Sequence, residues 1–457
     1  MSGFGLVQYL AGNVHWANVL DTSQRQFNPC PENGIMPLKK IPLVSPKKNA
    51  TPTSQARPKS WRDLPTSIWI LGFVSLLMDI SSELIHGLLP LFVVNVIGAS
   101  ALTLGEIEGL AEATASVAKV FSGVLSDKIG KRKLLTAFGY ALSAVTKPVF
   151  PLASSAGEIL AARFVDRIGK GVRDAPRDAL IADITPAEIR GVSYGVRLAL
   201  DQTGAFLGPL LAIFLMWLYA NDFRSVFWWA TLPAGLAVLL IVFGVQEPDN
   251  VKVLNNSGWP IQRKDLARLK MDYWMVVTVG VVFNFARFSE AFLVLKAQTA
   301  GLSVALAPMV FVCLSLVSAS VATPAGIISD IIGRKGLLLS GLIALVIADL
   351  VLAHLPGLYG VFIGVGFWGL SLGLSQGILS ALIADTAPED LRGTAFGVFN
   401  LLTGGALLMA SVVAGWLWQN SGPATTFLAG AASATMAVAL LALSTTLNMG
   451  KKKDSEP

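Results

Sequence analysis

Two short sequence patterns each occur twice in this chain, about 200 residues apart. The first contains Gly123, Asp127 and Gly130, is followed by cations, and recurs 203 residues later at Gly326, Asp330 and Gly333. The second contains Asp183 and Arg190 and recurs 202 residues later at Asp385 and Arg392. One duplication explains both offsets, and each copy lies between apolar segments. The repeat predicts two related halves around a central site, an arrangement typical of secondary transporters.

The composition indicates a membrane protein. Of the 457 residues 53% are hydrophobic and 14% are charged, whereas soluble domains carry roughly 25% charged residues. The apolar residues gather in runs of about 20, the length that crosses a bilayer as a helix. We therefore expect an all-α integral membrane protein with twelve transmembrane helices in two six-helix bundles. The predicted spans are 67–90, 103–125, 134–152, 157–180, 191–218, 226–245, 274–297, 304–328, 336–354, 358–383, 394–418 and 424–446.

Lysine and arginine in the short loops predict the orientation. They gather after the second and eighth spans, in the central loop and at the C-terminus, and are scarce in the opposite loops apart from Arg224. We expect a multi-pass protein of the inner or plasma membrane with both termini in the cytoplasm. The net charge of +6 is then a topology signal and does not indicate a nucleic-acid partner.

These patterns divide the chain into five parts. Residues 1–62 are polar and proline-rich, and we expect a disordered cytoplasmic tail there. The alternatives are translation from Met36 and a basic segment that touches anionic lipid. The N-terminal bundle is expected over 63–247, a cytoplasmic central loop over 248–272, the C-terminal bundle over 273–446 and a cytoplasmic tail over 447–457.

Cysteine and histidine usage excludes several classes of site. The chain has two cysteines, Cys30 and Cys313, and three histidines far apart, so no disulfide framework or metal cluster is expected. No nucleophile–base pattern is recognisable. We therefore expect neither an enzyme nor a resident cofactor or metal.

The loop pattern resembles that of the major facilitator superfamily, and the resemblance covers residues 65–446. The motif between helices two and three matches at Gly123, Asp127, Gly130, Arg132 and Lys133, and again at Gly326, Asp330, Gly333, Arg334 and Lys335. The fourth-helix motif matches at Arg163, but Asp166 and Arg167 replace its glutamine and glycine. The fifth-helix antiporter pattern matches at Gly195, Gly204, Gly208 and Pro209. Ala212 and Ile213 replace the last two glycines of the pattern. The resemblance implies a monomeric carrier similar to bacterial efflux members.

The repeated loops have two interpretations. Asp127 lies at the end of helix two, before the cations, and could form an ionic latch that holds a cytoplasmic gate shut. The alternative is that the cations only anchor the loop inside. The second pattern leaves gating and simple helix-end capping equally open. The predicted gating residues are Gly123, Asp127, Gly130, Arg132, Asp183, Arg190, Asp330, Gly333, Arg334, Asp385 and Arg392.

Charged residues inside the predicted spans indicate where function lies, because they are costly in a membrane. Asp79, Glu83 and His86 form one stripe of helix one, with Asp79 near the bilayer middle. We predict Asp79, Glu83 and Asp166 as proton-binding groups, attracted to cations such as Arg163 and Arg167. The other predicted cavity residues are His86, Glu112, Lys119, Tyr140, Lys147, Arg197, Asp201, Asn284, Arg287 and Glu290. Helix seven, with Asn284, Arg287 and Glu290, should face the cavity opposite helix one.

Two explanations of these charges remain. They can be salt-bridged packing elements, although buried ion pairs stabilise proteins poorly. They can also line a water-filled cavity for a solute and protons. The second predicts proton-coupled export of a small polar or charged solute by alternating access. The alternatives are proton-driven uptake, facilitated diffusion of a metabolite, and a non-transporting membrane sensor built on a transporter scaffold.

Overall fold

The computed structural model describes residues 64–186, 189–246, 263–388 and 391–453. The chain divides into two units, residues 1–57 and 58–457, and every described residue lies in the second. The predicted tail over 1–62 and residues 248–262 of the predicted central loop lie outside the described residues.

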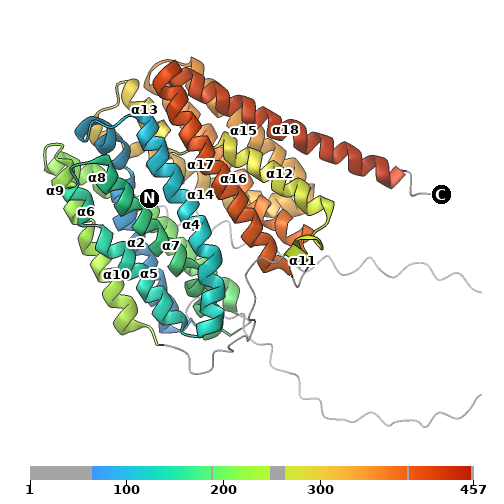
Figure 1. Ribbon diagram of the computed structural model, residues 1–457, viewed down its shortest axis with the longest axis horizontal. Coiled ribbons are helices and arrows are strands. Elements are labelled where there is room, and N and C mark those ends of the chain that lie inside the picture. Colours follow the sequence, from blue (N-terminus) through green and yellow to red (C-terminus); the bar gives the residue numbers. More distant parts are fainter. Residues whose placement is uncertain (1–63, 187–188, 247–262, 389–390, 454–457) are drawn as a thin grey trace, which may run out of the picture. The chain divides into compact units, whose positions relative to one another are not determined.

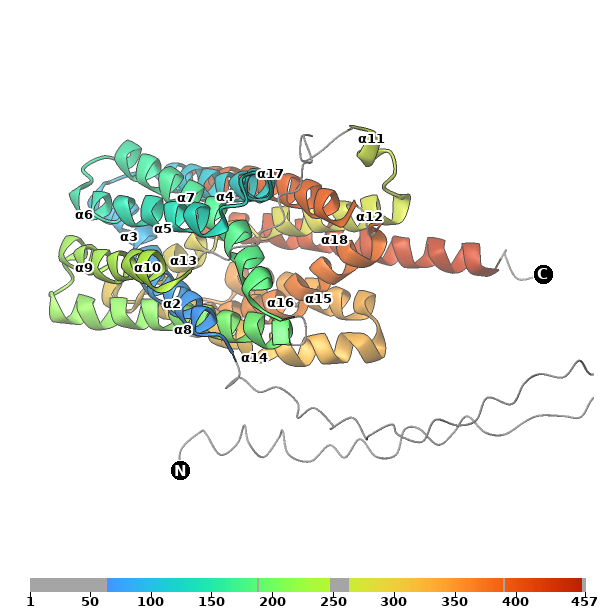
Figure 2. The ribbon, with the colours of Figure 1, turned by 90° about the horizontal axis from the view of Figure 1, so that it is seen from below.

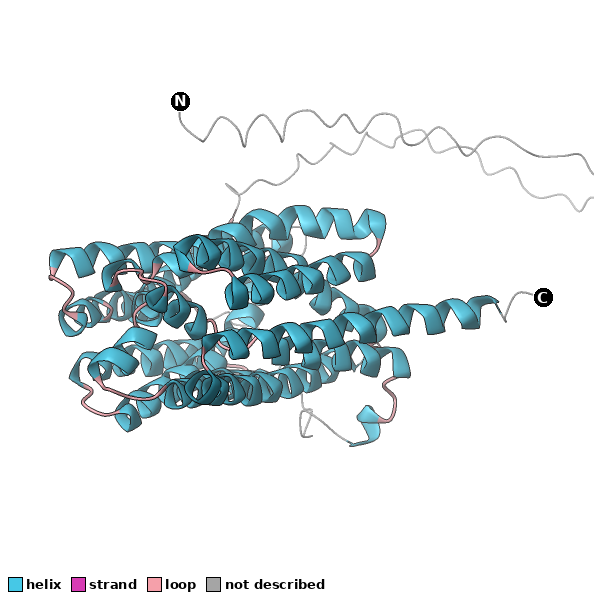
Figure 3. Ribbon diagram, turned by 90° about the horizontal axis from the view of Figure 1, so that it is seen from above, coloured by secondary structure: helices cyan, strands magenta, loops and turns pink. Residues whose placement is uncertain are grey.

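The described residues form helices and turns without a strand (Figure 3). The first half contains α2 (Thr66–His86), α3 (Leu89–Leu91), η2 (Phe92–Val96), α4 (Ala101–Ile129), α5 (Arg132–Thr146), α6 (Val149–Leu152), α7 (Ala156–Ile184), α8 (Arg190–Leu218), α9 (Phe223–Trp229) and α10 (Thr231–Gly244). The second half contains α11 (Arg263–Leu266), α12 (Met271–Ala286), α13 (Ala291–Thr299), η4 (Val304–Leu306), α14 (Met309–Ile332), α15 (Arg334–His354), α16 (Gly357–Thr386), α17 (Arg392–Ser421) and α18 (Pro423–Lys453).

Each predicted span falls on a helix or a pair of consecutive helices, and nine of the described helical segments are long and apolar enough to cross a membrane. Helices α4, α5 and α7 are not among these nine. In α4 and α7 the reason is the interior charges that the sequence already shows. Helix α18 runs to Lys453, beyond the predicted end at residue 446.

Local sequence signals explain where these helices begin and end. The Ser100 side chain accepts a hydrogen bond from the Thr103 N–H at the start of α4, and Ser155 does the same for Glu158 at the start of α7. Helix α4 ends at Gly130, whose φ of 68° lies in the left-handed region that glycine adopts without strain. A tight turn at Gly130 therefore separates α4 from α5.

Glycines bring helices of the two halves into close contact. A Cβ atom at Gly105 in α4 would lie 2.2 Å from the Ser411 carbonyl oxygen in α17, and one at Gly415 would lie 2.6 Å from the Ala101 carbonyl oxygen. Figure 1 shows α4 and α17 side by side along this stretch. Small residues permit such backbone approach between membrane helices. The halves therefore meet through a face that tolerates no larger side chain at these positions.

The fifth-helix glycine pattern has a packing role. A Cβ at Gly204 would lie 2.6 Å from the Leu76 carbonyl oxygen, and one at Gly208 would lie 2.9 Å from that of Ile80. Helix α8 thus lies directly against α2, as Figure 2 shows. This contact places the charged stripe of α2 beside the polar residues of α8.

The seventh predicted span is broken. Helix α12 ends at Ala286 and α13 begins at Ala291, so residues 287–290 are not helical. The break coincides with Arg287, Ser289 and Glu290, the polar residues that interrupt the apolar sequence. Non-helical backbone within a membrane segment is tolerated where it is buried in protein or lines a cavity.

Candidate functional site

A polar cavity of about 170 Å³ lies between the two halves. The first half contributes acidic and basic side chains from α2, α4 and α7, and the second half contributes the break between α12 and α13. The cavity is lined by Glu83, His86, Glu108, Glu112, Arg167, Lys170, Arg287, Phe288, Ser289, Glu290 and Leu407. The cavity thus contains groups that can bind a charged or polar molecule.

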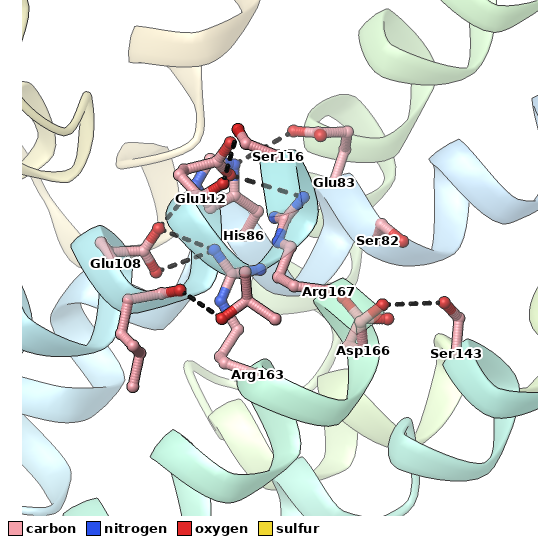
Figure 4. Close-up of polar contacts among 12 residues, drawn as sticks. Ser82, Glu83, His86, Glu108, Glu112, Ser116, Ser143, Arg163, Asp166 and Arg167 are labelled. Carbon is pink, nitrogen blue, oxygen red and sulfur yellow. Dashed lines mark hydrogen bonds and ion pairs between the residues drawn. The ribbon is translucent and has the colours of Figure 1, made fainter. Parts of the chain in front are cut away.

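The centre of the first-half wall is a buried ion pair. Arg163 of α7 donates from Nη2 to both carboxylate oxygens of Glu108 in α4, at 2.9 and 2.7 Å. Both side chains are 2% exposed. The Nε2 atom of His86 lies 3.4 Å from the same carboxylate. Three helices are therefore joined at Glu108, as Figure 4 shows.

Two further contacts extend this cluster. The Nδ1 atom of His86 lies 3.4 Å from Glu83, so the imidazole bridges two carboxylates. Arg167 Nη1 lies 3.5 Å from Glu112 Oε1. The His86 ring also packs on Phe311 of α14, with 4.8 Å between centroids. His86 therefore touches both halves of the protein.

Among the described residues, the ion pairs of Arg163 and Arg167 are with acids of α4 and not with Asp79 or Glu83, although Arg167 still attracts Glu83 electrostatically. Arg163 binds Glu108, and Arg167 binds Glu112. The reason is helix register, because α4 and α7 pack closely: a Cβ at Gly171 of α7 would lie 2.7 Å from the Ala115 carbonyl oxygen. This contact brings the α4 acids to the α7 guanidiniums.

Asp166 lies behind the cavity wall. Its carboxylate accepts a hydrogen bond from Lys147 Nζ at 3.0 Å, and Lys147 also donates to Ser82 Oγ at 3.0 Å. Both charged side chains are almost fully buried and do not line the cavity. This pair fits the packing explanation and ties α5 to α7 and α2.

Asp79 has an acidic neighbour. Its carboxyl lies beside that of Asp201 in α8, and Lys170 and Arg173 are cations that act on it electrostatically. Asp201 also accepts from Arg197 Nη2 at 3.3 Å, one turn away. The structure thus brings together three predicted residues, Asp79, Arg197 and Asp201, at the α2–α8 contact.

The remaining predicted cavity residues lie elsewhere. Tyr140 is buried and within 3.2 Å of Ser75, and the Arg173 guanidinium lies over its ring. Asn284 donates to the Gly280 carbonyl oxygen of its own helix. Neither Tyr140, Asn284 nor Lys119 lines the central cavity. A shared face on one helix was insufficient to place these residues in the cavity.

The two repeated patterns meet in space. Arg132 Nε lies 3.1 Å from Asp183 Oδ2, and Arg334, a cation of the second copy of the loop pattern, pairs with Asp385, the equivalent of Asp183. Arg190 donates to the Thr185 carbonyl oxygen and Arg392 to that of Ala384, which caps the preceding helix in each half. The side chains of Asp127 and Asp330 lie outside the described residues, so the predicted Asp127 latch stays a prediction.

The repeated pair gives a testable expectation. Exchanging the charges, Arg132→Asp with Asp183→Arg, should restore part of the predicted transport that either single change removes, because the pair joins the start of α5 to the last turn of α7. Transport by the three variants at equal membrane abundance is the measurement. Equal impairment of the double and single variants would show that the pairing is incidental. The matched pair Arg334→Asp with Asp385→Arg serves as the second-half comparison.

Sequence reasoning missed Glu108, Lys170 and Ser289 as cavity residues. Glu108 lies four residues before Glu112 in α4, so a helical-face argument extended by one turn could have found it. Lys170 follows Arg163 and Arg167 at helical spacing on α7. Ser289 lies in the break, where its hydroxyl accepts from the Ala291 N–H at 3.2 Å.

Comparison with known proteins places the chain among transporters. The sequence profile of the Major Facilitator Superfamily matches residues 71–410 and 277–456. An uncharacterised MFS-type transporter of Methanocaldococcus jannaschii is 30% identical over 404 residues, which is 86% of this chain and 99% of that protein. The inner membrane transport protein YajR of Escherichia coli is 24% identical and covers 79% of this chain and 80% of its own length. The multidrug resistance protein MdtH of Aeromonas hydrophila is 30% identical over 37% of this chain and 41% of its own length.

Solved structures show the same fold. The peptide transporter POT aligns with a TM-score of 0.71 at 13% identity, over 85% of this chain and 96% of that one. The nucleoside transporter NupG aligns with a TM-score of 0.70 at 13% identity, over 82% and 99%. At such identities the likeness concerns the fold alone.

Proposed function

Because the chain belongs to the Major Facilitator Superfamily, we propose that it is a proton-coupled secondary transporter that exports a small polar or charged solute by alternating access. The family makes it a multi-pass membrane transport protein. One observation carries the finer proposal: a polar cavity of about 170 Å³ is lined by charged residues of both halves. A site shared by two halves changes its exposure when the halves move.

The pair of Asp79 and Asp201 is the proposed proton site. Two neighbouring carboxyl groups disfavour double ionisation, so one proton stabilises the pair. The charged groups that act on it include Lys170, Arg173 and Arg177 from α7 and Arg197 from α8. A movement of α8 against α2 would separate the two acids and release the proton. Proton binding then favours one conformation, as coupling requires.

Contacts between the two halves at one end of the bundle support alternating access. Ala101 meets Gly415, and a Cβ at Gly87 in the turn after α2 would lie 3.0 Å from Pro308 before α14. These contacts join the two halves near the Ser100 end of α4. Alternating access requires them to part when that end opens. The absence of bulky side chains at Gly105 and Gly415 permits a tight seal.

Export by antiport rests on two supports. The fifth-helix pattern resembles that of antiporters, with Gly204 and Gly208 at the α2 contact. Several partial relatives are named multidrug resistance proteins. Uptake or facilitated diffusion remains the alternative within transport, and a non-transporting sensor is the alternative outside it.

Membrane vesicles test the proposal without a known substrate. Inverted vesicles with and without the protein are energised in the presence of a deproteinised cytosolic extract, and their contents are compared by mass spectrometry. Export by antiport predicts that at least one polar solute accumulates only with the protein and only while the pH gradient persists. Accumulation in right-side-out vesicles instead would favour uptake. No protein-dependent movement in either orientation would contradict transport.

Reporter fusions test the predicted orientation. Fusions after Asn95, Pro151, Asn221 and Gln419 should report an outside location, and fusions after Gly130, Asn255 and Gly333 an inside one. The reason is the cation excess in the loops of the second group. An outside signal from the fusion after Asn255 would contradict the two-bundle topology.

A further inference from the structure

The cavity wall contains three charges that the protein itself does not pair. Each first-half acid of the lining has a basic neighbour: Glu83 and Glu108 contact His86, and Glu112 contacts Arg167. Among the described residues, Lys170, Arg287 and Glu290 form no ion pair and no side-chain hydrogen bond, although all three line the cavity; the Arg287 guanidinium lies 5.9 Å from the centroid of the Phe283 ring. Buried or half-buried charges are usually paired, so these three point to a ligand.

The position of these charges agrees with a binding role. Arg287 and Glu290 lie in the break between α12 and α13, and Lys170 lies on α7 of the other half. Both halves thus present unpaired charge to the same space. Discontinuous helices at the interface of two repeats typically form substrate sites in transporters. A break of this kind brings no gain in packing over a continuous apolar helix.

The signs of the charges define the ligand. Lys170 and Arg287 call for an anionic group, and Glu290 calls for a cationic group. A simple anion would meet Glu83, Glu112 and Glu290, and a simple cation would meet Arg167, Lys170 and Arg287. Either simple ion would leave at least one charge of the cavity unpaired and would also be repelled by charges of its own sign. The cavity therefore discriminates against simple ions.

We propose that the transported solute is a small zwitterion, whose anionic group binds Lys170 and Arg287 and whose ammonium group binds Glu290. This inference rests on the proposed transport function. The cavity volume of about 170 Å³ can accommodate a molecule of about the size of an amino acid. The anionic group can be a carboxylate or another small oxyanion, because both accept hydrogen bonds from lysine and arginine.

Thermal unfolding of the purified full-length protein in detergent tests the ligand class. The probes are the twenty L-amino acids, β-alanine, γ-aminobutyrate and glycine betaine. The amino acids are compared with their amides, which lack the anion, and their N-acetyl forms, which lack the cation. At least one zwitterion should raise Tm, and its blocked forms should need at least tenfold higher concentrations. Equal stabilisation by a blocked form, or no shift with any zwitterion, would overturn the proposal.

Charge variants assign the two ends. Glu290→Gln should weaken binding of the zwitterion about tenfold. The N-acetyl form of the zwitterion should bind to this variant as tightly as to the unaltered protein. Arg287→Gln should shift the preference toward the amide. Lys170→Gln provides a second test of the anionic end if Arg287→Gln does not fold. The matched control is Glu106→Gln, an exposed acid of α4 outside the cavity. Unchanged selectivity in the cavity variants would overturn the assignment.

Binding and transport can fail separately. Zwitterion binding in detergent needs no gradient, so binding without movement in vesicles would contradict transport and retain the ligand class. Movement of a non-zwitterionic solute that needs Arg287 and Glu290 would retain the proposed function and overturn the ligand class.

Discussion

Replacing Arg163 with alanine is expected to lower the free energy of unfolding by about 3–5 kcal/mol and to abolish transport, because the change strands the buried Glu108 carboxylate. The guanidinium donates to both oxygens of Glu108 at a site 2% exposed, and without it the carboxylate keeps only the longer contact with His86 at 3.4 Å among those described above. The midpoint of thermal unfolding in detergent should fall by several degrees. Membrane abundance and Tm are measured together with vesicle transport.

A double variant separates the two effects of this change. Arg163→Ala with Glu108→Gln removes the stranded charge, so most of the lost stability should return. Transport should remain low, because His86 then lacks one of its two carboxylate neighbours. If Arg163→Ala leaves Tm unchanged, the pair does not contribute the stability that its burial indicates.

Replacing Asp79 with asparagine is expected to eliminate accumulation driven by a pH gradient while solute exchange continues. Asparagine mimics the protonated acid permanently, so the pair with Asp201 no longer gains or loses a proton during the cycle. Exchange needs no net change in protonation. Asp201→Asn should have the same effect, because the two acids adjoin each other.

The control for the coupling variants is Glu158→Gln, an acid at the exposed start of α7. It should retain gradient-driven accumulation. Should both Asp79→Asn and Asp201→Asn still accumulate solute with unchanged pH dependence, the coupling site lies elsewhere. Glu83, which contacts His86 at the cavity, would be the next group to test.

The fold could be predicted because its signals are local. Apolar runs gave the spans, and the repeated Gly130 and Gly333 marked matching turns. The polar residues Arg287, Ser289 and Glu290 marked the interruption of helix seven, although the break itself became visible only in the structure. The family assignment from these motifs is confirmed by the sequence profile and by the archaeal relative, and the solved structures show the same fold.

The partners within the site could not be predicted, because they depend on helix register. The sequence shows that Asp79, Asp166 and Arg163 are inside spans but does not show which acid meets which base. Close packing of α4 on α7 pairs Arg163 with Glu108, and packing of α8 on α2 puts Asp79 beside Asp201. The Arg132–Asp183 pair likewise joins two motifs that are 51 residues apart in the sequence.

The central claim is that the cavity between the halves opens alternately to the two faces of the membrane, and thiol accessibility tests it most directly. Leu407→Cys places a thiol in the cavity wall, in a background with Cys30→Ser and Cys313→Ser. An impermeant, positively charged methanethiosulfonate reagent is applied to right-side-out and to inverted vesicles at several pH values. We expect the reagent to label the thiol from both faces of the membrane. A change of pH that increases labelling from one face should decrease labelling from the other face. Labelling from one face alone under every condition would contradict alternating access and favour a non-transporting sensor.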